Sequence, residues 1–140
     1  HDFAQIWQTP DEGEAFIESQ LAMGAEEQAP FFEGMGAPRD DAEAMVEAMD
    51  ATMGACILAL YRSATPNTYA TWGEAMKPTK APGLVIHSTE DSFSNAAKSR
   101  EVADMLGARY EELDGLAHFW AVQDPAAGAA LLQRFWAEVR

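Results

Sequence analysis

The sequence predicts an α/β fold in two regions: an acidic helical region over residues 1–80 and a strand–helix–strand–helix region over residues 81–140. Apolar residues recur with a helical period before residue 60, whereas residues 84–86 (LVI) form a short continuous apolar run, typical of a strand buried on both faces. Charge divides the chain in the same way. Residues 1–60 hold 13 acidic residues and one basic residue (−12), and residues 61–140 hold ten and eight (−2).

Two long helices are expected in the first region. The first spans residues 11–29, with Asp11 as its cap and Pro30 as its end. The second begins at Asp40 or Asp41 and carries one apolar stripe at steps of three and four residues. The stripe consists of Met45, Met49, Met53, Cys56 and Leu60. Core packing is the simplest role for it, and the alternative is that its adaptable methionines line an apolar substrate pocket.

A strand, a helix and a second strand follow one another in the second region. The helix is expected over residues 94–106, with Ser94 as the candidate cap and Gly107 closing its end, and the second strand over residues 109–113. A last helix begins at Asp124-Pro125, a cap followed by proline in the first turn. A crossover of this kind makes the two strands parallel, so their C-terminal ends lie at one sheet edge, where open α/β sheets bind ligands.

Asp91 and His118 each follow one of the two predicted strands by a few residues. Since adjacent strands lie about 4.8 Å apart, turns leaving the same edge can bring a carboxylate to an imidazole. That pair orients the base in a catalytic triad. Glu90 and Asp114 are the alternative acids, and His87, at the end of an apolar strand, is better explained as a structural or pocket-lining residue.

The same segments resemble a known family. Residues 81–91 (APGLVIHSTED) look like the strand and turn that deliver the acid in α/β-hydrolases, and residues 113–119 (LDGLAHF) look like the turn that delivers the histidine. The resemblance covers residues 81–140 and implies that this is the C-terminal part of an α/β-hydrolase fold, with residues 1–80 as a helical cap and the return from it. It also implies that Asp91 and His118 are catalytic.

In this family the nucleophile precedes the acid and lies in a G-x-S-x-G turn, which the sequence lacks. The chain does not begin with Met, so we expect it to be processed, trimmed or cut from a longer one. The sheet is then incomplete without an N-terminal segment or a partner chain that carries the nucleophile. The implied activity is hydrolysis of a small, largely apolar ester or related acyl compound without a cofactor. An aspartate nucleophile would change the reaction to dehalogenation or epoxide opening.

Phe119, Trp120 and Met53 are the candidate substrate-binding residues. No spacing suggests a metal site, and a single cysteine, Cys56, excludes an internal disulfide and a cysteine-rich metal site. A net charge of −14 makes nucleic acid and anionic membranes poor partners, and no apolar run approaches the roughly 18 to 20 residues that span a bilayer. With no signal peptide visible, the sequence favours a cytoplasmic location over secretion.

A second hypothesis is non-enzymatic. The chain could be a hydrolase-like module that binds a ligand or a protein without turnover, with its acidic helices as the contact surface. A G-x-S-x-G turn in the preceding segment or in a co-purifying chain would support the enzyme, and the absence of such a turn would support the binding module.

Overall fold

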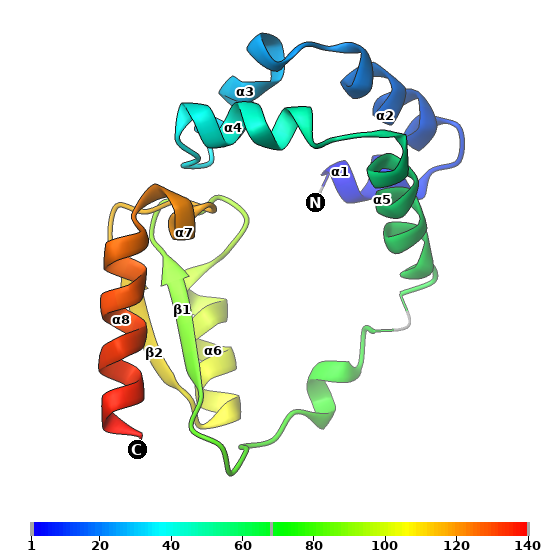
Figure 1. Cartoon of the computed structure of the whole chain (residues 1–140). Helices are drawn as coiled ribbons and strands as arrows, with labels where there is room; N and C mark the ends of the chain where they lie inside the picture. Colours follow the sequence, from blue (N-terminus) through cyan, green and yellow to red (C-terminus); the bar gives the residue numbers. More distant parts are fainter. Residues whose placement is uncertain (1, 68, 140) are drawn as a thin grey trace. The chain divides into compact units, whose positions relative to one another are not determined.

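The structure, a computed structural model, describes residues 2–67 and 69–139 and combines helices with a two-stranded parallel sheet (Figure 1). This confirms the α/β class in its coarse form. The elements in chain order are α1 (Asp2–Gln8), α2 (Glu12–Ala22), α3 (Ala25–Glu33), α4 (Arg39–Glu47), α5 (Ala51–Ser63), the 3-10 helix η1 (Trp72–Ala75), β1 (Leu84–Ser88), α6 (Ala96–Leu106), β2 (Arg109–Leu113), α7 (Trp120–Gln123) and α8 (Pro125–Glu138).

The chain forms two compact units. The helical unit comprises His1–Pro30 and Arg39–Glu74, and the sheet unit comprises Phe31–Pro38 and Ala75–Arg140. The segment Phe31–Pro38 therefore belongs with the C-terminal residues, although the sequence on both sides of it belongs to the helical unit.

In the helical unit, α1, α2 and α5 pack on one another. The ring centroids of Trp7 and Tyr61 lie 4.6 Å apart and join α1 to α5. Helix α2 approaches α5 at Gly54, where an added Cβ would lie 2.4 Å from Cγ2 of the buried Ile17. This close approach leaves no room for a side chain at Gly54.

An ion pair links the same two helices at the surface. The Arg62 guanidinium donates to both carboxylate oxygens of Glu14, at 2.6 and 2.7 Å, and Glu14 also accepts the Asp11 N–H at 2.9 Å. The hydrogen bonds from Arg62 are the main reason why the pKa of Glu14 is lowered to about 2. The charged form of Glu14 therefore stabilises this unit.

Both helices expected in the first region are each divided in two. The first is broken around Gly24, and Pro30 lies inside α3 instead of ending a helix. The second is broken between α4 and α5, where Asp50 caps α5 by accepting the Met53 N–H at 2.8 Å. No single helix in the described ranges is long and apolar enough to cross a membrane; α4 and α5 together would be, but they are bent by 88°.

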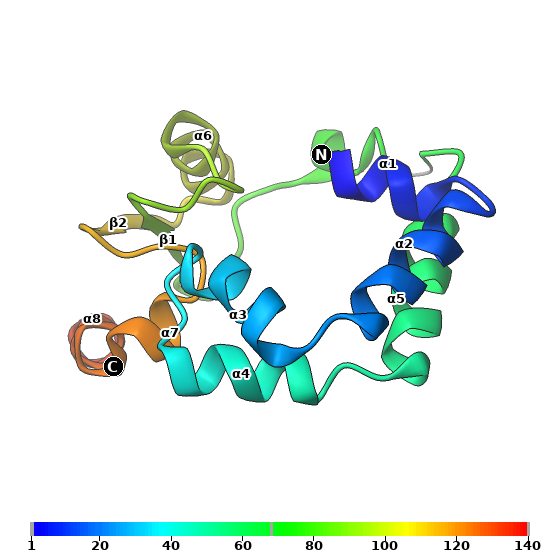
Figure 2. The same cartoon turned by 90° about the horizontal axis from the view of Figure 1, so that it is seen from above.

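In the sheet unit, β1 and β2 pair in parallel with a register running from Leu84↔Arg109 to Ser88↔Leu113. Helices α6 and α8 lie on opposite faces of the two strands (Figures 1 and 2). Both predicted strands and their parallel pairing are confirmed. They are the only strands within residues 2–67 and 69–139.

The predicted helix signals in the sheet unit hold with one correction. Asn95, not Ser94, caps α6, because its side chain accepts the Lys98 N–H at 3.1 Å. Gly107 ends α6 in the left-handed conformation (φ 64°), as predicted. Asp124 caps α8 by accepting the Ala127 N–H at 2.9 Å.

Candidate functional site

The turns that follow β1 and β2 are hydrogen-bonded to each other at one edge of the sheet. The Thr89 N–H donates to the Leu113 carbonyl at 3.1 Å, and the Glu90 N–H donates to the Leu116 carbonyl at 2.9 Å. The Gly115 N–H donates to the Thr89 hydroxyl at 2.8 Å. These bonds continue the parallel pairing beyond the strands, so the two turns form one rigid edge.

Asp91 and His118 meet at this edge. His118 Nδ1 lies 3.3 Å from each carboxylate oxygen of Asp91. The Asp91 side chain is 13% exposed and the His118 side chain 45% exposed, so the acid lies behind a ring that solvent can reach. An ionised carboxylate only accepts hydrogen bonds, so the contact requires a proton on Nδ1 and leaves Nε2 of the neutral ring as an acceptor.

Two phenylalanine rings flank the imidazole. The centroid of Phe93 lies 5.1 Å from that of His118, with the rings inclined by 67°, and the centroid of Phe119 lies 5.2 Å away at 80°. The ring centroid of Phe119 in turn lies 6.0 Å from that of Phe32, which belongs to the segment Phe31–Pro38. These edge-to-face contacts place apolar surface beside the imidazole.

The alternative acids lie elsewhere at the edge. Asp114 lies 3.5 Å from the Thr89 hydroxyl, and Glu90 is exposed. Asp91 is therefore the carboxylate that the fold brings to His118. Its position is fixed locally, since its Oδ1 accepts the Phe93 N–H at 2.9 Å.

His87 does not join this pair. It is 6% exposed, its Nδ1 lies 3.1 Å from the Ser94 hydroxyl, and its ring stacks on Tyr110 with centroids 6.4 Å apart. The contact with Ser94 ties the end of the acid turn back to β1. This arrangement agrees with the structural role expected from the sequence.

The three candidate substrate-binding residues have different surroundings. Phe119 contacts the His118 ring. Trp120 packs against α8, where a Cβ added at Gly128 would lie 2.5 Å from its ring. Met53 lies on α5 of the helical unit and is 49% exposed. The structure therefore brings one of the three to His118 and packs a second against a helix.

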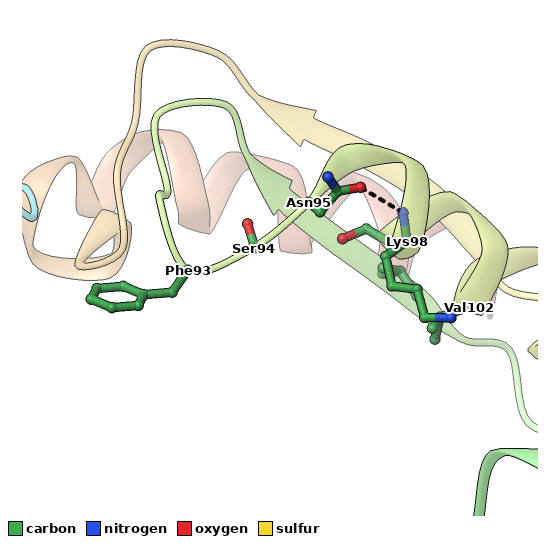
Figure 3. Close-up of a pocket in the computed structure, with 7 residues that line it drawn as sticks. Phe93, Ser94, Asn95, Lys98 and Val102 are labelled. Atoms are coloured by element: carbon green, nitrogen blue, oxygen red, sulfur yellow. Dashed lines mark hydrogen bonds between the residues drawn. The ribbon is translucent and has the colours of Figure 1, made fainter. Parts of the chain in front are cut away.

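Sequence reasoning missed a pocket of about 320 Å³ formed by β1, α6 and the turn between them (Figure 3). Val85, Val102 and Phe93 give it apolar walls, and Ser94 and Lys98 add polar groups. Phe93 lines this pocket and its ring also contacts His118, so this residue is shared by the pocket and the surroundings of the Asp91–His118 pair. The sequence feature that indicates this pocket is Phe93, an aromatic residue two positions after Asp91 in an otherwise polar turn.

No protein-family model, curated protein or solved structure matches the chain. In the parts of the chain that the structure describes, no group of three or more His, Cys, Asp or Glu side chains is arranged to hold a metal ion. The Asp91–His118 pair and its surroundings are therefore the features of this chain that bear on its function.

Proposed function

We propose that this chain is the C-terminal part of an α/β-hydrolase and supplies the acid, Asp91, and the base, His118, of a nucleophile–histidine–acid triad. One observation carries the proposal: His118 Nδ1 lies 3.3 Å from both oxygens of a mostly buried carboxylate, at the C-terminal edge of two parallel strands. A separation of 3.3 Å is slightly longer than a strong hydrogen bond, and such contacts tighten when substrate is bound.

In this mechanism His118 Nε2 takes the proton of the attacking nucleophile, and Asp91 stabilises the imidazolium that results. The nucleophile oxygen forms a bond to the substrate carbonyl carbon, and the imidazolium returns the proton to the alcohol that leaves. Water then attacks the acyl-enzyme, with the same ring taking its proton; the bond between the acyl carbon and the nucleophile oxygen breaks, the imidazolium returns the proton to the nucleophile, and the carboxylic acid leaves. Asp91 keeps its charge throughout.

The nucleophile comes from an N-terminal segment or a second chain. Two features support this part of the proposal: the sequence contains no G-x-S-x-G turn, and no strand in the described residues pairs with the second edge of β1. An open α/β sheet generally has four to six strands, and an apolar strand with a bare edge favours aggregation. The companion segment would add strands, the nucleophile and the amides of the oxyanion hole.

The substrate is a small, largely apolar ester or related acyl compound. Phe93 and Phe119 support this class because they flank the base and present apolar surface to whatever occupies the space beside it. Val85 and Val102 extend that surface into the adjoining pocket.

A covalent probe tests the proposal. A fluorophosphonate should label a serine in the companion segment of the assembled protein, and His118→Ala should abolish the labelling, because the base activates the serine. A catalytic aspartate would give no serine label, but turnover would still require His118. The absence of both labelling and turnover in the assembled protein would contradict the proposal and favour the binding module.

A further inference from the structure

The backbone on both sides of His118 is held by groups that are distant in sequence or belong to another element. The Ala117 N–H donates to Oε1 of Gln123 at 2.7 Å, and the Phe119 N–H donates to the carbonyl of Met35 at 3.0 Å. Ala117 is 7% exposed, so its N–H has little access to water if the Gln123 bond is lost.

Gly36 follows Met35, one of the two acceptor residues, and lies against Gln123, the other. A Cβ at Gly36 would lie 2.5 Å from Gln123 Oε1 and 3.0 Å from the Ala117 Cβ, and its φ of +94° is one that glycine adopts readily. The Met35–Gly36 turn can therefore lie directly against Gln123 and Ala117 only because residue 36 has no side chain.

Gln123 is itself fixed by the short helix α7. Its N–H donates to the Phe119 carbonyl at 2.9 Å, and the Trp120 N–H donates to the Ala117 carbonyl at 3.1 Å. The side chain of Gln123 thus turns back onto the residue that precedes His118. The loop carrying the base becomes a closed structure of hydrogen bonds.

We infer that Gln123, together with Met35 and Gly36, forms a clamp that sets the position of the His118 imidazole against Asp91. Gln123 is a positioning residue, because it acts on His118 through its hydrogen bond with the Ala117 backbone. The inference rests on the proposed function for its effect on catalysis, but not for its effect on the geometry of His118.

The clamp also makes the segment Phe31–Pro38 part of the catalytic edge. That segment comprises the last turn of α3 and the loop to α4, and it is the part of the N-terminal region that packs within the sheet unit. A displacement of its Met35 carbonyl would release the Phe119 N–H and loosen the turn that holds the base.

The test uses the full ¹⁵N-labelled chain, in the assembly in which it is purified, and compares Gln123→Leu with Gln123→Glu. The leucine removes the acceptor, whereas the glutamate keeps an oxygen at the same place. Gln123→Leu should speed exchange of the Ala117 N–H about tenfold and shift the downfield signal of the His118 Nδ1 proton. It should lower kcat by about 10- to 100-fold with little change in KM, because a misplaced base slows the chemical step. Gln123→Glu should restore all three quantities.

Gln28→Leu is the control, because it removes a glutamine side chain that also bonds to the backbone but lies in the helical unit, where its Nε2 donates to the carbonyls of Gln20 and Met23. It should leave the His118 signal unchanged. An unchanged His118 signal in folded Gln123→Leu would overturn the clamp, as would rapid exchange of the Ala117 N–H in the wild-type protein, a measurement that needs no variant to fold. An intact clamp with hydrolysis that does not depend on His118 would instead refute the proposed function alone.

Discussion

At the residue scale, Asp91 reaches His118 because its own turn is tightly fixed. The Asp91 N–H donates to the Ser88 carbonyl at 3.1 Å, and its carboxylate accepts the Phe93 N–H at 2.9 Å. Because the Phe93 N–H binds one oxygen of the Asp91 carboxylate, the orientation of this carboxylate does not depend on His118 alone. In the proposed triad, this orientation would favour the His118 tautomer that carries its proton on Nδ1.

Asp91→Asn should reduce ester hydrolysis by the assembled protein about 10⁴-fold, because an amide at this position no longer favours the tautomer with a free Nε2. Glu90→Gln is the matched control: it neutralises the neighbouring, exposed carboxylate and should change the rate less than about twofold. Steady-state kinetics measure both. Equal losses in the two variants would mean that charge at the edge matters and the Asp91–His118 pair does not.

The pairing of Asp91 with His118 could be predicted because parallel strands bring their following turns together, a rule that depends only on local pattern. The roles of Met35 and Gln123 could not. Met35 is far from Phe119 in sequence, and its contribution is a backbone carbonyl, which any residue type supplies. A contact made by a backbone group does not depend on the residue type, so the sequence does not indicate it.

At the scale of elements, the strands and helices of the sheet unit follow the sequence signals closely, whereas the helical unit does not. The apolar stripe through Met45 and Met53 suggested one helix, but Asp50 competes with the helix by capping a new one. Helix α1 was not predicted, although its residues hold a helical signal. Phe3 and Trp7, four positions apart and stacked at 5.7 Å, were its signal.

Gly54→Ala should destabilise the helical unit by about 1 to 2 kcal/mol, because the added methyl overlaps Ile17, a buried β-branched side chain with few alternative rotamers. Gly24→Ala is the control, since a Cβ there has no neighbour within 4 Å. It should be neutral or slightly stabilising. Denaturant unfolding of both variants in the assembled protein gives the comparison, and a Gly54→Ala protein as stable as Gly24→Ala would show that α2 and α5 do not approach so closely.

Glu14→Gln should flatten the acid dependence of stability. The pKa of Glu14 is lowered to about 2 from its usual 4.5 by the Arg62 pair, so its contribution is fully present above pH 4.5 and is lost as the pH falls toward 2. The variant lacks that contribution at every pH, and its melting temperature should fall less steeply over this range. Glu18→Gln removes the same charge from the exposed surface of α2 and should keep the wild-type slope. If the melting temperatures of all three proteins fall in parallel with pH, the Glu14–Arg62 ion pair does not contribute to stability.

At the scale of the whole molecule, the helical unit and the sheet unit differ in whether they require further strands. The helical unit packs its aromatic side chains among α1, α2 and α5, whereas the sheet unit has two strands covered by helices on both faces. A parallel sheet of this kind normally continues, because its interior strands are apolar on both faces and paired along both edges.

We therefore expect residues 1–140 expressed alone to lack hydrolytic activity and to unfold without a sharp cooperative transition. Under the proposed function, co-expression with the companion segment should restore both properties, because that segment would supply strands, nucleophile and oxyanion hole. Chemical denaturation and hydrolysis of a small activated ester measure the two properties. A monomer of these residues that unfolds cooperatively and hydrolyses the ester would contradict the division of the enzyme into two parts.

The most direct test of the central claim is the turnover of His118→Ala in the assembled protein. If His118 is the base, turnover should fall by several powers of ten while circular dichroism and thermal unfolding stay close to those of the wild type, because the ring is partly exposed and contributes little to the core. Near-normal turnover in the folded variant would contradict the assignment of Asp91 and His118 as the acid and base of a hydrolase.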